Sequence, residues 1–287
     1  MNIYILIVNY NSWRHSLSLV ESISQSTDDR YQIILIDNGS TDDSYQQLLS
    51  STYPFKLLQT AKNGGFAYAN NHFIKQILEE DAFVWLLNPD TLVDKNALKY
   101  LLEGVNKNAK NIYTTSIYSV GEKEGQRRSG LCKINKYLGT TSHISHLKKE
   151  VEADYVYGAS LFCHVQAFKE LGLLPEHYFL YWEETAWCHW AKRAGYQFKW
   201  VEHAIVYDKV SSLSYEKQFV SEYYYSFNAL RFFKTYYPLY LPLVLCANVA
   251  RYWYRRMKGT GQRSKAILKA SIDFLKKRSI PLPNQIN

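Results

Sequence analysis

Acidic and amide side chains occur in several short segments of this 287-residue chain, at places where they could handle a charged ligand. Asn88-Pro89-Asp90-Thr91 directly follows the apolar run Val84–Leu87. A carboxylate at the tip of a buried strand is costly to desolvate unless it is paired or bound to a metal. Together with a diphosphate, Asp90 could hold Mg²⁺ or Mn²⁺, because these hard cations prefer oxygen ligands. The competing interpretation is a plain Asn-Pro-Asp turn without a ligand.

Two adjacent carboxylates, Glu183 and Glu184, stand at the start of a segment with helical apolar spacing. A carboxylate in this setting can take the proton of an attacking hydroxyl group. Each neighbour raises the pKa of the other, while the positive end of the helix dipole partly stabilises both charges. The competing interpretation is that acidic residues are common in the first turn of any helix.

Three further positions carry weaker signals. Asp37 ends an apolar run and could accept a hydrogen bond from a pyrimidine N3–H, or act in a turn or helix cap. Asn63-Gly64-Gly65 would let the backbone approach a ligand closely, although a simple turn explains it as well. Asp208 follows the last expected strand and is either another metal ligand or an ion-pair partner of Lys209.

The elements that must position these residues alternate between strand and helix over the first 95 residues. The expected elements are apolar strands at Ile3–Val8, Tyr31–Ile36, Lys56–Gln59 and Phe83–Leu87, with helices at Trp13–Ser24 and Ala67–Glu79. Continuous apolar strands that alternate with helices predict an α/β fold with a mostly parallel, Rossmann-like sheet. Such sheets bind ligands beyond the carboxyl ends of their strands, where Asn9-Tyr10-Asn11, Asp37 and Asn88 to Asp90 stand.

The rest of the chain has a different pattern. Residues 104 to 152 are polar and predict a variable region or flexible loop, with a basic stretch from Lys123 to Arg128. Ser40 and Asp43 suggest a capping box for a second helix, and a later helix should stop at Gly195. Strands are expected at Phe198–Val201 and Ala204–Tyr207, and Tyr-, Leu- and Arg-rich helices from about Ser214 onward.

Composition restricts the class of protein. Hydrophobic residues make up 47% of the chain, which argues against disorder, and aromatic residues make up 16%. The net charge of +8 suits an anionic partner, but no nucleic-acid-binding module is recognisable, so we expect no nucleic-acid partner. Four scattered cysteines without a CxxC pair indicate a reducing compartment. With no signal peptide expected at the N-terminus, we predict a cytoplasmic protein.

In their order along the chain, these motifs resemble glycosyltransferase family 2, and in particular its rhamnosyltransferase-like branch from bacterial polysaccharide and O-antigen synthesis. The resemblance covers residues 3 to 230. The matching segments are Ile7–Asn11, Ile36–Ser40, Asn63–Ala67, Leu87–Thr91, Tyr178–Glu184, Ala191–Tyr196 and Tyr223–Asn228.

The resemblance implies a GT-A fold and an inverting, metal-dependent transfer of a sugar from a nucleotide diphosphate to a glycan or lipid-linked acceptor. The roles that it implies are as follows: Asn9, Tyr10, Asn11 and Asp37 for the nucleoside; Asn63, Gly64, Gly65, Asn88 and Asp90 for the rest of the donor; Asp90 and Asp208 for Mg²⁺ or Mn²⁺; Glu184 for the general base, with Glu183 as its rival. The domains expected are a catalytic domain at 1–213, with a nucleotide-sugar half (1–103) and an acceptor half (104–213), and a helical region at 214–287.

The sequence departs from the family pattern in three places. Asn88 replaces the first Asp of the Asp-x-Asp metal motif, and Glu184 replaces the Asp that usually serves as base. Ala186 and Trp190 replace an Asp and an Arg that often follow the base. These departures leave open a non-catalytic homologue that only binds a nucleotide sugar. A sugar nucleotidyltransferase is a further alternative, disfavoured because the first strand lacks a Gly-rich phosphate loop.

The helical region contains the apolar segment Leu239–Ala247, which is about half as long as the roughly 20 residues that a membrane span needs. Pro242 interrupts it, and Arg251, Arg255, Arg256 and Lys258 follow. This pattern predicts an amphipathic patch on the anionic inner face of the cytoplasmic membrane. Packing on the catalytic domain, or burial in a homodimer, are the alternatives.

Overall fold

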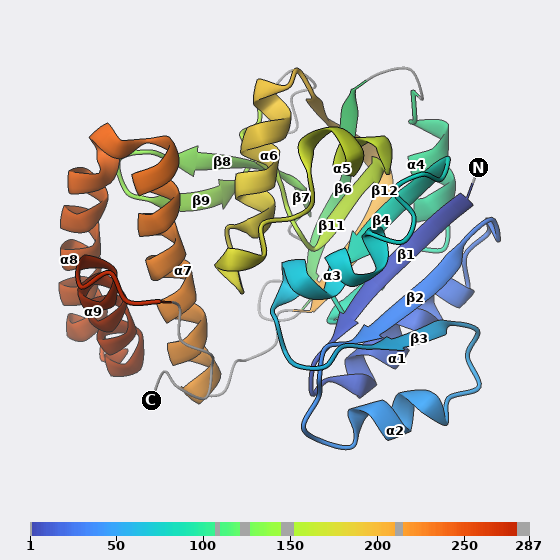
Figure 1. Cartoon of the computed structure of the whole chain (residues 1–287), viewed down its shortest axis with the longest axis horizontal. Helices are drawn as coiled ribbons and strands as arrows, with labels where there is room; N and C mark the ends of the chain where they lie inside the picture. Colours follow the sequence, from blue (N-terminus) through green and yellow to red (C-terminus); the bar gives the residue numbers. More distant parts are fainter. Residues whose placement is uncertain (1, 107–109, 121–126, 145–151, 210–214, 280–287) are drawn as a thin grey trace.

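The chain folds as an α/β protein around a curled central sheet, seen in a computed structural model that describes residues 2–106, 110–120, 127–144, 152–209 and 215–279 (Figure 1). The strands of the central sheet are β1 (Asn2–Asn9), β2 (Gln32–Asp37), β3 (Lys56–Gln59), β4 (Ala82–Leu87), β5 (Thr91–Val93), β6 (Asn111–Val120), β7 (Arg127–Ser129), β11 (Ser160–His164) and β12 (Gln197–Lys209). A smaller sheet contains β8 (Leu131–Asn135), β9 (Thr140–His143) and β10 (Tyr155–Val156).

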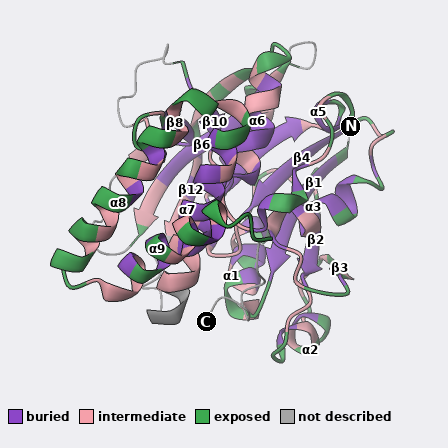
Figure 2. Ribbon diagram, turned by 60° about the vertical axis from the view of Figure 1, so that its left-hand side comes forward, coloured by how far each residue is buried: buried purple, intermediate pink, exposed green. Residues whose placement is uncertain are grey.

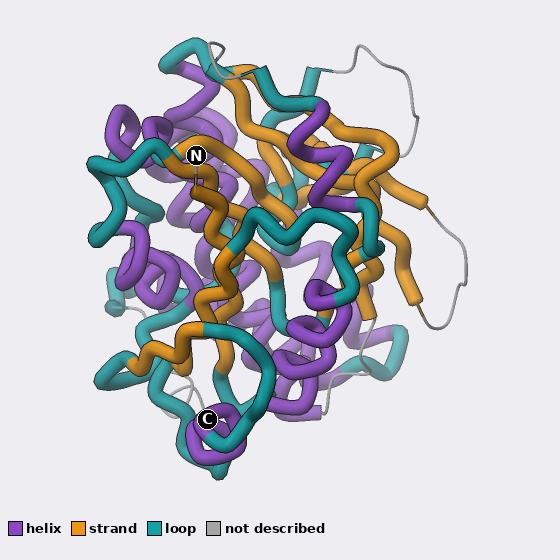
Figure 3. The backbone as a smooth tube through the Cα atoms, turned by 90° about the vertical axis from the view of Figure 1, so that its right-hand side faces the viewer, coloured by secondary structure: helices purple, strands orange, loops and turns teal. Residues whose placement is uncertain are grey.

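Helices cover the central sheet and form a separate group at the C-terminal end (Figure 1). They are α1 (Trp13–Ser24), α2 (Ser44–Leu49), α3 (Phe66–Ile74), α4 (Ala97–Glu103), α5 (Gln166–Leu171), α6 (Glu183–Arg193), α7 (Tyr215–Tyr236), α8 (Leu241–Met257) and α9 (Gly261–Leu275), with short 3₁₀ turns at Glu176–Tyr178 and Pro238–Tyr240. Viewed from the side, the strands lie between helices, as the predicted α/β class requires (Figure 3).

The sheet order is β3-β2-β1-β4-β11-β6-β12-β5. The four strands β3, β2, β1 and β4 are all parallel, which confirms the prediction for the first 95 residues. Beyond β4 the sheet also contains antiparallel pairs, because β11 is antiparallel to both β4 and β6. Since parallel neighbours share a carboxyl edge, the ends of β1, β2 and β4 bring Asn9, Asp37 and the segment after Leu87 to the same edge.

Side-chain alternation explains why these strands have no polar face. In β1, Tyr4, Leu6 and Val8 pack into one hydrophobic cluster, while Ile3, Ile5 and Ile7 pack into the cluster on the opposite face. Helix α1 covers the second face with Leu19, Val20 and Ile23, which recur at helical spacing. Figure 2 shows the result, with the central strands buried and the outer sides of the C-terminal helices exposed.

Several local predictions were wrong. The region 104–152 is not an irregular loop in its described part, because it supplies β6 to β9, while Lys123 to Gln126 lie outside the described residues. The helix expected at Ala67–Glu79 is α3, which ends at Ile74. Ser40 and Asp43 form no capping box: Asp43 precedes α2 without a side-chain cap, and the Ser40 hydroxyl bonds to Asp37 instead. The strands predicted at 198–207 are one strand, β12, with an irregularity between Val201 and Ile205.

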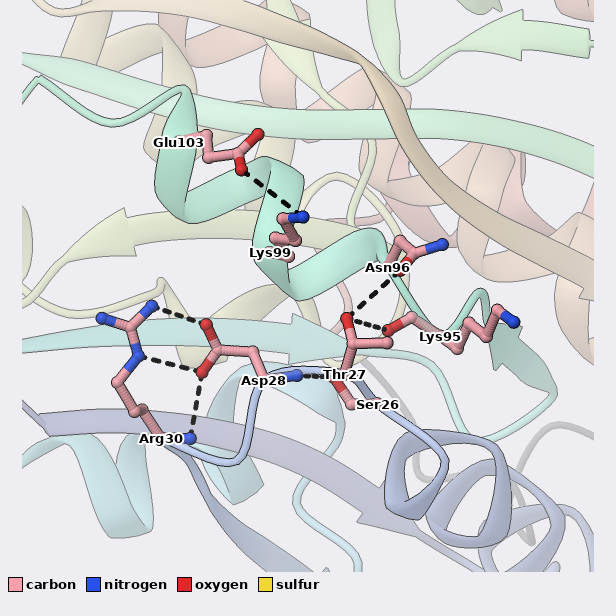
Figure 4. A network of polar contacts seen from close by, with 8 residues as sticks. All are labelled: Ser26, Thr27, Asp28, Arg30, Lys95, Asn96, Lys99 and Glu103. Carbon is pink, nitrogen blue, oxygen red and sulfur yellow. Dashed lines mark hydrogen bonds and ion pairs between the residues drawn. The ribbon is translucent and has the colours of Figure 1, made fainter.

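A polar network joins the connection between α1 and β2 to the start of α4, at the amino end of β2 (Figure 4). Thr27 donates its backbone amide to the Lys95 carbonyl at 2.8 Å, and its hydroxyl contacts Asn96 at 3.2 Å. Arg30 pairs with the Asp28 carboxylate at 2.5 Å, which lowers the pKa of Asp28 through this hydrogen bond. The network stabilises the edge of the sheet opposite to the clustered polar residues.

The C-terminal helices pack on one another and, through α7, on the rest of the chain (Figure 1). Buried Tyr223, Tyr224 and Phe227 of α7 contact α9 and also Phe179, which precedes α6. Within the described residues, every helix is too short or too polar to cross a membrane. The predicted helical nature of the region from about Ser214 is confirmed.

Candidate functional site

The carboxyl ends of β1 and β2 are joined by a buried polar network around Asp37. The Asn9 side-chain amide donates to Asp37 Oδ1 at 2.9 Å, and the Ser40 hydroxyl donates to the same oxygen at 2.5 Å. Ser16 of α1 donates to the Asn9 carbonyl oxygen at 2.9 Å, which fixes the orientation of the Asn9 amide. Both Asp37 and Asn9 are fully buried. The network holds the Asp37 carboxylate rigidly, with Oδ2 facing only the Ser40 amide at 3.2 Å.

Asn11 and Tyr10 form the outer part of the same edge. The Asn11 backbone adopts a positive φ of 49°, and its side-chain oxygen accepts from the Thr41 amide at 2.8 Å. Its side-chain amide donates to the Thr41 hydroxyl at 3.0 Å. Tyr10 is exposed beside this turn, where its ring could stack on a flat ligand. The structure thus brings Asn9, Tyr10, Asn11 and Asp37 together.

The glycine loop that follows β3 is fixed by Asn38, a residue that sequence reasoning did not select for the site. The Asn38 amide donates to Asn63 Oδ1 at 3.0 Å and to the Gly65 carbonyl at 3.2 Å, while its own oxygen accepts from the Gly64 amide at 3.3 Å. Gly65 has a φ of +89°, and a Cβ there would lie 2.0 Å from the Phe179 carbonyl oxygen. Glycine is therefore required at this point, because the loop touches the segment that leads into α6.

Asp90 and Asp208 meet at the edge between β5 and β12. Asp208 lies opposite Thr91 in the antiparallel register, next to the turn that carries Asp90. Desolvation by burial raises the pKa of Asp90, and burial together with the nearby Asp90 charge raises the pKa of Asp208 to about 6. The Asn88 to Thr91 turn predicted from the sequence is present, closed by the Thr91 hydroxyl on the Asn88 carbonyl at 2.7 Å. The Lys209 side chain, the alternative partner of Asp208, lies outside the described residues.

Tyr157 stands between the two groups of carboxylates. Its hydroxyl donates to Asp208 Oδ2 at 3.4 Å. Burial raises its pKa, and so do the charges of Asp208, Asp90 and Glu184, in that order. The next residue, Gly158, lies against the Glu184 side chain, so this half-buried phenol stands between Asp208 and Glu184. No sequence signal pointed to Tyr157, since a tyrosine in a chain with 25 of them carries little information.

The two half-buried carboxylates of Asp90 and Asp208 fit Mg²⁺ or Mn²⁺ in one particular way. In the described part of the chain, no three His, Cys, Asp or Glu side chains gather into a complete metal cage. Mg²⁺ is commonly held by one or two carboxylates, with waters and substrate phosphates as the other ligands. Asp90 and Asp208 match that donor set, and their raised pKa values are what an uncompensated carboxylate pair produces.

Glu183 and Glu184 begin α6 and differ in their surroundings. Both carboxylates keep a buried Oε2 without a hydrogen-bond partner. Burial raises the pKa of Glu184 to about 7, although the backbone amides of Glu184, Thr185 and Gly158 partly stabilise its charge. Burial, and then the Glu184 charge, raise the pKa of Glu183 well above its usual range. Glu184 lies beside Gly158, one residue from Tyr157, whereas the Glu183 charge acts on Tyr178 and Tyr181.

The backbone before α6 is strained. Phe179, Tyr181 and Trp182 all have positive φ values, of 62°, 63° and 74°. Such conformations cost roughly 1 to 3 kcal/mol each and persist only where the surroundings impose them. Asn228 of α7 supplies the constraint, because its buried side-chain amide donates to the carbonyls of Tyr178, Leu180 and Tyr181 at 2.6, 2.8 and 3.1 Å. Strain of this kind clusters at functional sites, and here it precedes Glu184 directly.

Comparisons with known proteins find similar sequences and similar structures. The profile of "Glycosyl transferase family 2" matches residues 4–172. One relative is "Minor teichoic acid biosynthesis protein GgaA" of Bacillus subtilis, 26% identical over 188 residues that make up 63% of this chain and 41% of the relative. Another is "Low-salt glycan biosynthesis hexosyltransferase Agl10" of Haloferax volcanii, 24% identical over 66% of this chain and 61% of the relative. The chain thus spans about half the length of these curated relatives.

Solved structures share the fold at low sequence identity. The chain superposes on S. aureus TarS 1-349 with a TM-score of 0.55 at 12% identity, covering 97% of this chain and 92% of TarS 1-349. For mannosyltransferase PcManGT of Pyrobaculum calidifontis, in complex with GDP-Man and Mn²⁺, the TM-score is 0.55 at 11% identity, covering 96% and 87% of the two chains. These neighbours are glycosyltransferases, and the GT-A fold expected from the sequence is confirmed.

Proposed function

The chain belongs to glycosyl transferase family 2, and on that premise we propose that it is an inverting, metal-dependent transferase acting on a nucleotide-diphosphate sugar. The acceptor would be the hydroxyl group of a glycan or of a lipid-linked sugar in surface polysaccharide synthesis. One observation carries the proposal: Glu184, whose buried Oε2 has no partner, lies against Gly158, and the adjacent Tyr157 hydrogen-bonds Asp208 of the Asp90–Asp208 pair. A base, together with carboxylates that can hold a cation for the leaving diphosphate, is what metal-dependent inverting transfer requires.

In this proposal the donor lies along the carboxyl edge of the sheet. Asp37 and the segment Asn9 to Asn11 hold the nucleoside, and Asn63-Gly64-Gly65 with Asn88 line the path of the diphosphate and sugar. Asp90 and Asp208 hold Mg²⁺ or Mn²⁺, which when bound would offset the charge that builds on the departing diphosphate.

Glu184 is the proposed general base. The acceptor O–H proton moves to its carboxylate while the acceptor oxygen forms a bond to the anomeric carbon, and the bond from that carbon to the diphosphate oxygen breaks. Attack from the face opposite to the leaving group inverts the anomeric centre. Glu184 is favoured over Glu183 because it lies on the side of Tyr157 and Gly158, and because a base works best with a pKa near the working pH.

A screen of donors tests this function. The chain is incubated with UDP-, GDP- and dTDP-sugars, dTDP-rhamnose and UDP-N-acetylhexosamines among them, with Mn²⁺ and simple glycoside acceptors. We expect acceptor-dependent release of the nucleoside diphosphate from one donor class. Tight donor binding without release under any condition would instead support a non-catalytic binding protein, and release of pyrophosphate would support a nucleotidyltransferase.

We also propose that the helical region, taken as residues 214–287 beside a catalytic domain at 1–213, rests on the inner membrane surface. Val249, Trp253 and Met257 recur every fourth residue of α8 and are 58%, 56% and 78% exposed. Exposed Arg256 and Lys258 border this apolar face. An apolar stripe with basic flanks favours anionic membranes. Salt-sensitive cosedimentation with vesicles containing phosphatidylglycerol is expected, whereas a concentration-dependent dimer without vesicle binding would assign this face to a second copy.

A further inference from the structure

A pocket of about 440 Å³ lies where β9, the strained segment before α6, and helices α7 and α8 meet. Its wall is lined by one acidic, two basic and several hydroxyl side chains: Thr140, Thr141, Tyr181, Ser221, Glu222, Tyr225, Arg251 and Arg255. Figure 1 shows the hairpin of β8 and β9 reaching from the catalytic core toward α7 and α8. None of these residues belongs to the proposed donor site.

The pocket lies near the proposed base. Tyr181 precedes Glu184 by three residues, and the charges of Glu183, Asp90 and Glu184 contribute to the raised pKa of Tyr181, after burial. On the opposite wall, Thr141 hydrogen-bonds Tyr155, another buried phenol on which the Glu184 charge acts. The pocket therefore lies next to the segment that leads into Glu184, on the side of the C-terminal helices, and Tyr181 separates the two.

The pocket contains a half-buried cation, Arg251, that keeps an unsatisfied donor. Arg251 keeps a buried Nε without a hydrogen-bond partner, and one of its terminal nitrogens donates to the side-chain oxygen of Asn248. It makes no ion pair with any carboxylate in the described chain. Burial lowers its pKa, the direction expected for a desolvated cation. Glu222, on the same wall, acts on the Arg251 charge from beyond ion-pair distance, so the buried Nε still lacks an acceptor that an anionic ligand would supply.

The surrounding groups complete an oxyanion site. Arg255 adds a second guanidinium, which is only loosely engaged by Glu222 at 3.8 Å. The Tyr225 hydroxyl oxygen accepts from the Thr141 amide at 2.8 Å and shares a further hydrogen bond with the Thr141 hydroxyl at 3.1 Å, so one of these two hydroxyl groups has a proton to donate to a ligand. Two guanidinium groups with hydroxyl donors match the tetrahedral oxygens of a phosphate group. An apolar depression of about 230 Å³, lined by Leu138, Ala247 and Tyr254, continues from Thr140 and Arg251.

We propose that this pocket binds a phosphate group of the acceptor, so that the acceptor is a phosphate-linked sugar whose hydroxyl is thereby presented to Glu184. The inference rests on the proposed function and specifies its substrate class. The apolar depression would take the carbon chain of a lipid phosphate, whereas a phosphorylated glycan would use the guanidinium groups alone.

The test measures binding of two phosphate probes in the presence of EDTA, so that metal-assisted binding at the donor site is suppressed. Isothermal titration calorimetry with glucose 1-phosphate and with dodecyl phosphate below its micelle concentration compares the wild-type protein with Arg251→Met. Arg256→Met is the matched control, because it removes the same charge from an exposed position on the same helix. We expect Arg251→Met to weaken binding about tenfold or more, as loss of a charge-assisted contact implies, and Arg256→Met to leave it unchanged.

The outcomes of these titrations separate the proposal from its alternatives. If both probes bind and Arg251→Met weakens both, the pocket is a site for a phosphate group. If only dodecyl phosphate binds in an Arg251-dependent way, the phosphate is that of a lipid. No binding of either probe, or an equal loss in Arg256→Met, overturns the proposal. Arg251→Lys controls for misfolding of Arg251→Met. It keeps the positive charge at this position, so it should retain part of the affinity for the phosphate probes. Binding of nucleotide sugars with Mn²⁺, measured in parallel, should be the same in all variants. If wild type binds no nucleotide sugar, the proposed function fails independently of the phosphate result.

Discussion

The side-chain amide of Asn228, in the middle of α7, donates to the backbone carbonyl of Tyr181 at 3.1 Å, three residues before Glu184. Through this contact and its bonds to Tyr178 and Leu180, a C-terminal helix determines the backbone of the strained segment that leads into α6. The helical region therefore lies next to the site and also holds part of its backbone in place. The sequence motif around Asn228 marked the start of this helix, but it gave no indication that the amide reaches back across 47 residues.

Asn228→Ala should therefore lower kcat more than it raises KM for the donor. Loss of the amide leaves three carbonyls without their donor, at a cost of about 1 to 3 kcal/mol in the free energy of unfolding. Asn71→Ala is the matched control, because this buried amide also joins distant segments, donating to the Leu174 carbonyl at 2.8 Å. Assays well below both melting temperatures should show the kcat loss in Asn228→Ala alone. Equal kcat values in the two variants would contradict a positioning role.

Gly65→Ala should disrupt the contact between the glycine loop and the segment before α6. The added Cβ would lie 2.0 Å from the Phe179 carbonyl oxygen, at a backbone φ of +89°. Gly172→Ala is a close control, since Gly172 has a φ of +84° but open space around its Cβ position. Thermal unfolding and donor titration should show a larger loss of both stability and donor affinity for Gly65→Ala. If the two variants lose equal stability and bind donor alike, the close approach to Phe179 has no role.

Binding of the nucleoside diphosphate should depend on a metal ion held by Asp90 and Asp208. Asp90→Asn and Asp208→Asn should each weaken Mn²⁺-dependent binding of the nucleoside diphosphate by about tenfold, because one anionic ligand is lost. Calorimetric titration of the diphosphate with Mn²⁺ and with EDTA checks this. The prediction is wrong if the EDTA and Mn²⁺ affinities of the wild-type protein are the same.

Protonation of Glu184 should affect stability and activity in opposite directions. Its folded pKa of about 7 lies above the ordinary glutamate pKa of 4.5, so between these values the folded state binds the proton that the unfolded state has released. Stability from this group is therefore lost as the pH rises through that window. Compared with Glu184→Gln, the wild-type melting temperature should fall from pH 5 to pH 8. Activity should instead rise over the same range, with an inflection near pH 7. A melting-temperature difference that is independent of pH would contradict the assignment.

The sequence predicted those parts of the site that depend on regular patterns. Apolar strands and turn residues located Asn9, Asp37 and Asp90, because parallel strands necessarily bring their carboxyl ends to one edge. Residues 104–152 were misread because the buried middle of β6 is polar (Thr114, Thr115 and Ser116) and β7 to β9 are short; β6 is stabilised by pairing with the distant strands β11 and β12 rather than by local propensity. Tyr157, Asn38 and Asn228 were missed for a similar reason. Their roles depend on contacts across the fold, which single-residue patterns do not encode.

The central claim is that Glu184 removes the acceptor proton, and the pair Glu184→Gln and Glu183→Gln tests it most directly. Both substitutions are nearly isosteric, and each removes a carboxylate with one buried, unpartnered oxygen from the same helical turn. Single-turnover transfer is measured with the donor identified by the screen, alongside donor affinity. The account predicts a loss of about a hundredfold or more in transfer for Glu184→Gln, with donor affinity retained, and a much smaller loss for Glu183→Gln. Wild-type transfer by Glu184→Gln would contradict it.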